Sequence, residues 1–357
     1  MEPLLCVDGW GDYEIVGVLV RLEESVERKE RESMKYYMAP MEGLTGYIYR
    51  NAYHRCFHPM DKYFTPFLSP KSNKGLSSRE LNDILPEHNQ GLFVVPQILT
   101  NRWEDFLGTA EILREYGYGE VNLNLGCPSG TVVSKKKGAG FLAVPEELNR
   151  FLEKVCSGLD TMGTELSVKT RLGNVSEDEF YGLMEIYNQY PLKELVVHPR
   201  IRSDYYKNVP RMKVFEYSME SASCPVCYSG DIFTAKDYRR LVKESPELRS
   251  VMLGRGLVAN PGLREEVQGE GCLDKERFRT FHGLIYEGYR RIMSGDRNVL
   301  FKMKELWSLM IHMFYDEGSY AKKIKKAQRL EEYEAAVDLV LRDLELVRGG
   351  GFQPERH

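Results

Sequence analysis

The sequence lacks the features that would place it in a membrane or secreted class. No stretch approaches 18 uncharged apolar residues, so we expect no membrane-spanning helix and no membrane partner. The N-terminus lacks the basic, apolar and small-residue order of a secretory signal. Seven cysteines, an odd number spread irregularly over 357 residues, argue against a disulfide framework. Together these absences predict a cytoplasmic protein.

Charge of either sign is not in large excess. The formal net charge is −4, so a polyanionic partner would require positive charge to be concentrated locally. The hydrophobic fraction of 42% and the charged fraction of 29% are ordinary for a globular protein.

The sequence does contain a regular alternation of short apolar runs and amphipathic stretches. Helical spacing of apolar residues occurs at 101–116, 145–159, 177–190 and 234–244. Eight strands alternating with helices predict an α/β fold, a (β/α)8 TIM barrel. A doubly wound open sheet is the structural alternative, because strand periodicity does not separate the two. The expected strands are 36–41, 62–67, 93–99, 120–126, 166–172, 194–200, 226–230 and 250–254.

The composition changes after the last strand, where only long helical patterns remain, at 278–293, 300–314 and 330–347. We therefore expect the barrel over residues 34–270 and a smaller all-helical domain over 271–348. Residues 349–357 form a tail that we expect to fray. Residues 1–33 match neither pattern and are interpreted either as an N-terminal accessory extension of uncertain order or as an artefact of the choice of start site. The sequence leaves the oligomeric state open, and a monomer is favoured.

Polar or glycine-rich residues follow seven of the eight expected strands. In a barrel these positions meet at one rim, where chemistry gathers. The glycine turns after the seventh and eighth strands are where many such barrels bind phosphate, although either turn alone could serve only as a tight turn. The rim residues are Pro40-Met41-Glu42, Gln97, Asn124 with Cys127, Lys169 with Arg171, His198 with Arg200, Ser229-Gly230-Asp231 and Gly254-Arg255.

Lys169 lies within an apolar strand, where an inward ammonium group needs an anion or an electron-rich ring. With Gln97, it suits the polar edge of an isoalloxazine ring; the alternative is a lysine that extends to solvent at the rim. His198, at the same rim, is either structural or part of this site.

Cys127 lies in the turn Asn124-Leu-Gly-Cys-Pro128 after the fourth strand. Gly126 and Pro128 fix the turn, so the thiol can project towards the barrel mouth and donate a proton. A buried structural cysteine is the alternative. The Asn124 amide can orient a planar, amide-like ring.

A cysteine pair and two basic stretches also carry binding chemistry. Cys224 and Cys227 form a C-x-x-C at a strand with no second pair to complete a zinc site, so we interpret them as structural and expect no metal. The basic stretches 322–326, with Arg329, and 135–137 supply the local positive charge that phosphate-backbone binding requires, although such runs are usually solvated faces.

At the level of motifs, the chain resembles the tRNA-dihydrouridine synthase family from residue 35 to the end of the barrel. The element around Asn124 and Cys127 is the most diagnostic. The matching segments are Met38-Ala-Pro-Met-Glu-Gly-Leu-Thr45, Gln97-Ile-Leu99, Val121-Asn-Leu-Asn-Leu-Gly-Cys-Pro-Ser129, Lys137-Gly-Ala-Gly140, Val168-Lys-Thr-Arg-Leu-Gly173, Val197-His-Pro-Arg200 and Met252-Leu-Gly-Arg-Gly256.

The resemblance implies an FMN-dependent oxidoreductase that uses NADPH to reduce the C5=C6 bond of uridines in tRNA. It implies hydride transfer to C6, protonation of C5 by Cys127, and Asn124 and Arg171 as residues that face the uracil. One departure is Ser229, where the family usually has asparagine; we expect FMN binding to survive it. The implied FMN-binding residues are Pro40, Met41, Glu42, Gln97, Lys169, His198, Ser229, Gly230, Asp231, Gly254 and Arg255.

Two alternatives stay open at this point. One is a flavin barrel that acts on a free pyrimidine such as dihydroorotate, which would share the phosphate turns. The other is a tRNA-binding protein without catalysis, for which Cys127 would be dispensable. The sequence does not indicate which uridine is reduced.

Overall fold

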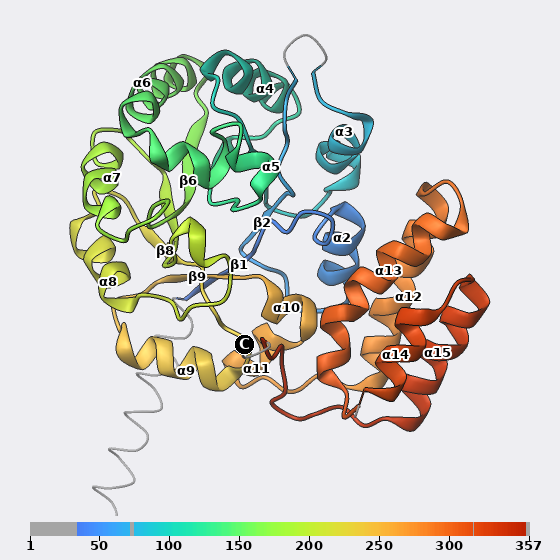
Figure 1. Ribbon diagram of the computed structural model, residues 1–357. Coiled ribbons are helices and arrows are strands. Elements are labelled where there is room, and N and C mark those ends of the chain that lie inside the picture. Colours follow the sequence, from blue (N-terminus) through green and yellow to red (C-terminus); the bar gives the residue numbers. More distant parts are fainter. Residues whose placement is uncertain (1–33, 72–74, 317, 355–357) are drawn as a thin grey trace, which may run out of the picture.

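The computed structural model describes residues 34–71, 75–316 and 318–354, and the expected extension at residues 1–33 lies outside them. All eight expected strands are present, and each is shorter than predicted or shifted by a residue at one end. The third is divided in two, which gives nine parallel strands in one sheet (Figure 1). They are β1 (Lys35–Met38), β2 (Lys62–Phe64), β3 (Val94–Val95), β4 (Gln97–Ile98), β5 (Glu120–Leu125), β6 (Glu165–Arg171), β7 (Glu194–His198), β8 (Val226–Tyr228) and β9 (Ser250–Leu253).

The strand order confirms the barrel and excludes the open doubly wound sheet. The order runs β3-β2-β1-β9-β8-β7-β6-β5-β4, so its two ends are β3 and β4, which are consecutive in the chain. Leu68, beyond β2, also forms a parallel bridge with Ile98 of β4. The sheet therefore bends back on itself into a nearly closed ring, with helices around the outside.

The division of the third strand occurs at Pro96, which has no backbone N–H to donate to a ladder. β3 pairs with β2, whereas β4 pairs with β5. The carbonyl oxygen of Pro96 still accepts from the Asn122 amide at 2.9 Å. The single expected strand thus pairs with two neighbouring strands, through β3 on the side of β2 and through β4 on the side of β5.

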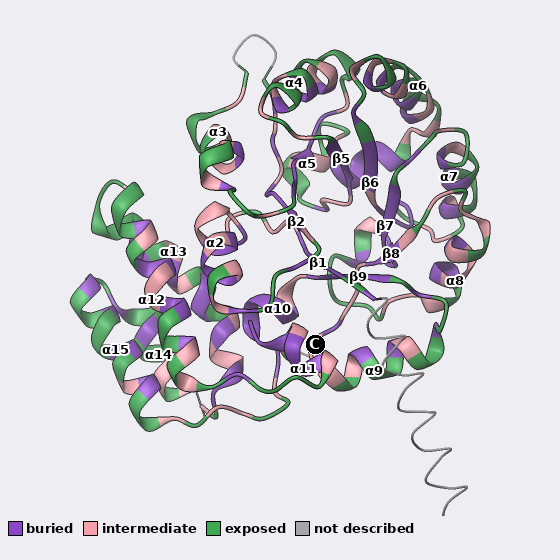
Figure 2. Ribbon diagram, turned by 180° about the vertical axis from the view of Figure 1, so that it is seen from behind, coloured by how far each residue is buried: buried purple, intermediate pink, exposed green. Residues whose placement is uncertain are grey.

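Helices cover the outside of the barrel, and their outer faces are exposed while the strands are buried (Figure 2). The four predicted helices are present, and two of them begin as expected: Pro145 opens α6, and Thr234 caps α9 by accepting from the Asp237 amide. The barrel helices are α2 (Tyr47–Cys56), α3 (Ser78–Ile84), α4 (Trp103–Glu115), α5 (Gly130–Val133), α6 (Pro145–Met162), α7 (Glu179–Tyr187), α8 (Met212–Ser221), α9 (Ala235–Glu244), α10 (Arg255–Ala259) and α11 (Leu263–Gln268).

The inside of the barrel is apolar on one side and polar on the other. The apolar side is a separate small core of seven buried residues, Tyr37, Ala39, Phe64, Val95, Val196, Cys227 and Met252. Strands β4 to β6 contribute amide and hydroxyl side chains instead: Asn122 accepts from Gln97 at 2.7 Å and donates to Ser167 at 2.9 Å. Cys227 thus packs in the core, and each cysteine of the described ranges is a free thiol.

The C-terminal helices form a bundle beside the barrel, which we call the helical bundle: α12 (Lys275–Ile292), α13 (Asp296–Met310), α14 (Ser319–Lys326) and α15 (Leu330–Asp343) (Figure 1). α12 packs against α2, and a Cβ at Gly288 would lie 2.6 Å from Ile48. Tyr49 meets Phe281 edge to face across the same contact. The bundle is therefore joined to the barrel by close helix packing.

The tail differs from the expectation that it frays. Gly351 is buried, and a Cβ there would lie 2.0 Å from the Phe233 carbonyl oxygen. The ring of Phe352 packs against those of Phe233 and His312. The described part of the tail lies against the barrel because its glycines permit a close backbone approach.

Within the described ranges, no helix is long and apolar enough to cross a bilayer, and no cluster of three or more His, Cys, Asp or Glu side chains could hold a metal ion.

Candidate active site

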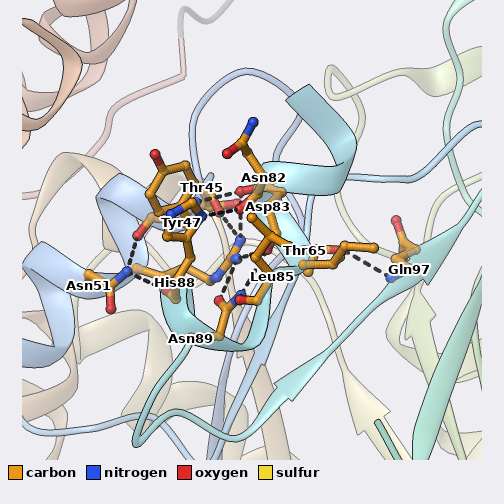
Figure 3. A network of polar contacts seen from close by, with 12 residues as sticks. Thr45, Tyr47, Asn51, Thr65, Asn82, Asp83, Leu85, His88, Asn89 and Gln97 are labelled. Carbon is orange, nitrogen blue, oxygen red and sulfur yellow. Dashed lines mark hydrogen bonds and ion pairs between the residues drawn. The ribbon is translucent and has the colours of Figure 1, made fainter. Parts of the chain in front are cut away.

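The loop after β1, residues 40–45, is the first part of the rim, and we call it the rim loop. The hydroxyl of Thr45 accepts from the Met41 amide at 2.8 Å and donates to the Ala39 carbonyl oxygen at 3.0 Å. Buried Arg50 of α2 donates to the Thr45 carbonyl oxygen and, at 2.9 Å, to Asn89. Figure 3 shows Thr45, Asp83 and Asn89 in one network of polar contacts. Sequence reasoning missed Thr45 and Arg50 as residues that fix this loop.

The turn that carries Cys127 is held by Asn124. Its amide oxygen accepts from the Cys127 amide at 2.9 Å and from the Gly126 amide at 3.1 Å. Its amide nitrogen donates to Gln97 at 2.6 Å. Asn124 was predicted to face a substrate ring; the structure shows it ordering the Cys127 turn, and one of its two amide N–H groups is not used in these contacts.

The segment 137–140 packs beneath this turn. Gly138 has φ +55°, and a Cβ there would lie 2.8 Å from the Cys127 carbonyl oxygen. A Cβ at Gly140 would lie 2.7 Å from the Val133 carbonyl oxygen. Both glycines are therefore required by close approach, a role that the Gly-x-Gly spacing could have signalled.

Cys127 itself is partly buried at the rim. Burial raises the pKa of its thiol, although Arg171 and Lys169 act in the opposite direction. The thiol is thus protonated at neutral pH and able to act as an acid. Asn124 pairs in register with Lys169 of β6, so the turn adjoins the strand that carries this lysine.

Arg171 is buried and binds three backbone carbonyl groups. It donates to Gly126 at 2.9 Å, to Ile201 at 3.0 Å and to Tyr205 at 2.8 Å. It therefore joins the turn after β5 to the loop after β7. Tyr205 has a φ of +51°, rare for a residue with a side chain, and its carbonyl is one of the three that Arg171 holds.

A narrow cavity of about 80 Å³ opens at the rim. All the predicted cofactor residues line it except two. Glu42 is exposed and forms an ion pair with Arg79 at 2.5 Å, and Gln97 is fully buried in the polar interior of the barrel. The predicted residues that line the cavity are Pro40, Met41, Lys169, His198, Ser229, Gly230, Asp231, Gly254 and Arg255.

Lys169 is the most informative of these residues. No hydrogen bond or ion pair joins its ammonium group to any residue of the described chain. Burial, reinforced by Arg171, lowers its pKa to about 8. A partly buried cation without a partner carries a desolvation cost, and a ligand with electron-rich or anionic atoms would relieve that cost.

The part of the rim formed by the loops after β7, β8 and β9 has more positive than negative charge. Asp231 accepts from Arg200 and from Arg255, each at 2.9 Å, so two guanidinium groups share one carboxylate. His198 lies 3.0 Å from Arg200, and burial together with Arg171, Lys169, Arg200 and Arg255 lowers its pKa well below the ordinary range. His198 is therefore neutral, and the site favours an anion. Arg200 was named in sequence as a rim residue but not as part of this site.

The two glycine turns are packed against each other. A Cβ at Gly256 would lie 2.1 Å from the Ile232 carbonyl oxygen, and one at Gly230 would lie 2.1 Å from the Tyr228 hydroxyl. Close packing alone therefore requires glycine at both positions, whether or not the turns bind phosphate. This end of the cavity is lined by small residues next to Arg255, namely Ser229, Gly230 and Gly254.

The cavity adjoins a larger pocket of about 980 Å³, with which it shares Tyr206, Asp231, Phe233 and Arg255. The ring of Tyr206 lies 4.5 Å from the Arg255 guanidinium and is 46% exposed. Phe352 of the tail packs on the other side of Arg255, at 5.2 Å. Sequence reasoning missed both aromatic residues, because each joins the site only through the fold.

The predicted basic stretches lie on the surface. The lysines of 322–326 are on α14 of the helical bundle and are exposed, as is Arg329. Lys135 and Lys136 are exposed beside the Cys127 turn, and Lys136 pairs with Glu147 at 3.1 Å.

The fold and the rim together define a class: a (β/α)8-barrel protein with an electropositive cavity and a protonated thiol at the C-terminal ends of its strands. A family model described as dihydrouridine synthase (Dus) matches residues 37–348, and the chain belongs to that family.

Curated relatives agree with the family match. A tRNA-dihydrouridine(16) synthase of Pseudomonas putida is 30% identical over 236 residues, which cover 64% of this chain and 72% of the relative. A probable tRNA-dihydrouridine synthase of Staphylococcus aureus (strain MRSA252) is 26% identical over 72% of this chain and 78% of the relative.

Solved structures with a similar chain course are more distant. Morphinone reductase matches with a TM-score of 0.48 and 12% identity over 69% of this chain and 88% of its own. A variant of NCR from Zymomonas mobilis matches with a TM-score of 0.45 and 13% identity over 69% and 90%.

Proposed function

We propose that this protein is a tRNA-dihydrouridine synthase that reduces the C5=C6 bond of uridine in tRNA, with FMN at the rim cavity and NADPH as reductant. The observation that carries the proposal is the Cys127 turn, held by Asn124 beside the strand that carries Lys169, a cavity-lining lysine without a partner among the described residues. Family membership supports the same reaction.

The residues present fit FMN. Lys169 would meet the electron-rich edge of the ring, which removes the cost of its unpaired charge. Arg255, with Ser229, Gly230 and Gly254, would hold the phosphate, and the second guanidinium on Asp231 balances the added negative charge. When bound, FMN supplies the hydride that the uracil accepts at C6.

The protein residues would position the base and move one proton. Cys127 donates its proton to C5 as negative charge develops there, and its raised pKa keeps the thiol protonated until that moment. Asn124 and Arg171 act chiefly by fixing the Cys127 turn, and Asn124 retains one N–H for a uracil carbonyl. The uridine must leave its stack to reach this rim.

Binding of tRNA would use positive charge that does not belong to the cavity. The exposed lysines of α14 and the pair Lys135–Lys136 beside the Cys127 turn are suited to phosphate groups of an RNA backbone. We propose that the RNA spans the rim and the helical bundle and is recognised by shape. We also propose that the protein acts in the cytoplasm and as a monomer.

The test combines an assay with purified protein and a map of tRNA from cells. Protein with FMN and NADPH is given an unmodified tRNA transcript, free uracil or orotate (the oxidised partner of dihydroorotate), and the products are measured by mass spectrometry. We expect dihydrouridine in the transcript only, and its loss at specific positions in tRNA from cells without the gene. Reduction of free orotate or uracil, or an unchanged dihydrouridine map together with no product in vitro, would contradict the proposal.

A further inference from the structure

The rim loop contacts the helical bundle as well as the barrel. The ammonium group of Lys302, on α13, donates to the Gly43 carbonyl oxygen and, at 2.9 Å, to Glu305. The Lys302 side chain is only 17% exposed. Gly43 has φ +77°, and a Cβ there would lie 3.2 Å from Glu305 and 3.3 Å from the Lys302 ammonium nitrogen. Loop and helix therefore fit together with glycine alone at this point.

The other side of the same loop forms the cavity wall. Met41 lines the cavity, and its sulfur lies 3.6 Å from the position of a Cβ at Gly254. The Met41 carbonyl oxygen accepts from the amides of Leu44, at 3.0 Å, and Thr45, at 3.1 Å. Gly43 lies within this closed turn, so a displacement of Gly43 would be passed to Met41.

The end of the loop is tied to the helical bundle too. α2 follows the loop directly, and its Ile48 and Tyr49 pack against Gly288 and Phe281 of α12. On the barrel side, the hydrogen bonds of Thr45 and Arg50 hold the end of the loop, whereas the ion pair of Glu42 with Arg79 is exposed and contributes little. The bundle thus holds the rim loop at its middle and at its end.

We infer that Lys302 is a positioning residue for the cofactor side of the barrel rim. Through the Gly43 carbonyl it fixes the turn that presents Met41 to the cavity. The helical bundle is then part of the cofactor site, in addition to its proposed contact with RNA. The inference depends on the proposed function only for the choice of FMN as the probe.

The chain offers a matched control on the same helix. Lys304 also donates its ammonium group to a backbone carbonyl, that of Ala327, but within the helical bundle. Full-length Lys302→Met, Lys302→Arg, Lys304→Met and Gly43→Ala proteins would be compared with the parent. The measurements are FMN affinity by fluorescence titration, the visible flavin spectrum, and amide hydrogen exchange of residues 41–45 in flavin-free protein.

We expect Lys302→Met and Gly43→Ala to weaken FMN binding about tenfold, to shift the flavin spectrum and to speed amide exchange in the rim loop. Lys304→Met should leave all three within twofold, and Lys302→Arg should restore most of the affinity. Equal FMN affinity and equal rim-loop exchange in the Lys302→Met and Lys304→Met proteins would overturn the inference. Hydrogen exchange needs neither flavin nor RNA, so a failure of the proposed activity would leave this comparison readable.

Discussion

Each end of the barrel holds a lysine that is partly shielded from solvent, and the charged neighbours of the two lysines differ. At the N-terminal end, Lys62 of β2 reaches Glu120 at 2.8 Å and Glu194 at 3.4 Å. Burial alone would lower the pKa of Lys62, but the two carboxylates outweigh it and the pKa is raised. At the C-terminal end, Lys169 has no such partner, and its pKa is lowered to about 8.

The difference separates a site whose charges are paired within the chain from a site whose excess positive charge favours a ligand. Around Lys62 the polar groups satisfy one another, since Tyr37 donates to Glu194 at 2.8 Å and Ser250 donates to it at 3.3 Å. Around Lys169 and His198 the protein gathers several cations and a single shared carboxylate, Asp231. Charges that are paired within the chain need no ligand to compensate their desolvation. Unpaired charges carry a desolvation cost that a bound anion would offset, which favours binding.

The largest expected effect is at the rim. Cys127→Ala should reduce dihydrouridine formation by about 10²- to 10⁴-fold, because the proton donor is lost, while FMN stays bound. Product formation in single turnover and flavin content by absorbance check the two parts. Cys156→Ala, on α6, is the control that removes a partly buried thiol elsewhere. Activity that survived in the Cys127→Ala protein would favour a non-catalytic role.

The next effect is on stability at the opposite end. Lys62→Met leaves two buried carboxylates without their cation and should lower the free energy of unfolding by about 3–5 kcal/mol. Denaturant titration measures this. Adding Glu120→Gln to Lys62→Met should recover part of the loss, which keeps the test informative if the single variant folds poorly. A loss below about 1 kcal/mol would break the contrast between the two ends.

Lys169→Met should show the reverse pattern. The flavin-free protein should be as stable as the parent or more stable, because an unpaired buried charge is removed. FMN affinity should fall about tenfold to a hundredfold, the range for a hydrogen bond from a charged donor. Unfolding and FMN titration on the same sample decide between this and a structural lysine, for which stability would fall and affinity would not.

The two lysines also predict opposite dependence on pH. The pKa of Lys169 is about 8 in the folded protein and about 10.4 in an unfolded chain, so unfolded chains bind this proton more tightly between those values. The free energy of unfolding therefore rises with pH across that window on account of Lys169. For Lys62, whose pKa is raised, the stabilisation is complete below the ordinary lysine pKa and is lost only above it.

Unfolding of flavin-free parent and Lys169→Met proteins from pH 7 to pH 10 measures this dependence. The free energy of unfolding of the parent should increase relative to that of the Lys169→Met protein as the pH rises. A difference in the free energy of unfolding that stays constant with pH would mean that the pKa of Lys169 is not lowered in the folded protein.

The smallest effect is expected at Ser229. Its backbone N–H is used by the Val197 carbonyl at 2.9 Å, so only the side chain is free to change its contact with a phosphate. Ser229→Asn should strengthen FMN binding about two- to tenfold, as one neutral hydrogen bond would. Ser229→Ala is the control and should weaken it within the same range. A larger effect than that of Lys169→Met would show that the phosphate turn, not the lysine, dominates affinity.

Much of the candidate site was accessible from sequence because barrel topology is periodic. Once eight strands are placed, their following residues must share one rim, which is how Lys169, His198 and Asp231 could be grouped. The pattern did not resolve the break at Pro96, because a short apolar run reads the same on both sides of a proline. It also did not separate Glu42 and Gln97 from the cavity, since adjacent rim positions differ in the direction of their side chains.

The sequence by itself determined the strand and helix rhythm, the order of the rim residues and the family. Those features depend on local propensity and on spacing along the chain. Only the tertiary structure decided that Lys62 is paired while Lys169 is not, that Arg171 and Asn124 hold the Cys127 turn, and that Lys302 reaches the rim loop. These outcomes depend on contacts between residues far apart in sequence, and the charge state of a buried group is set by such neighbours.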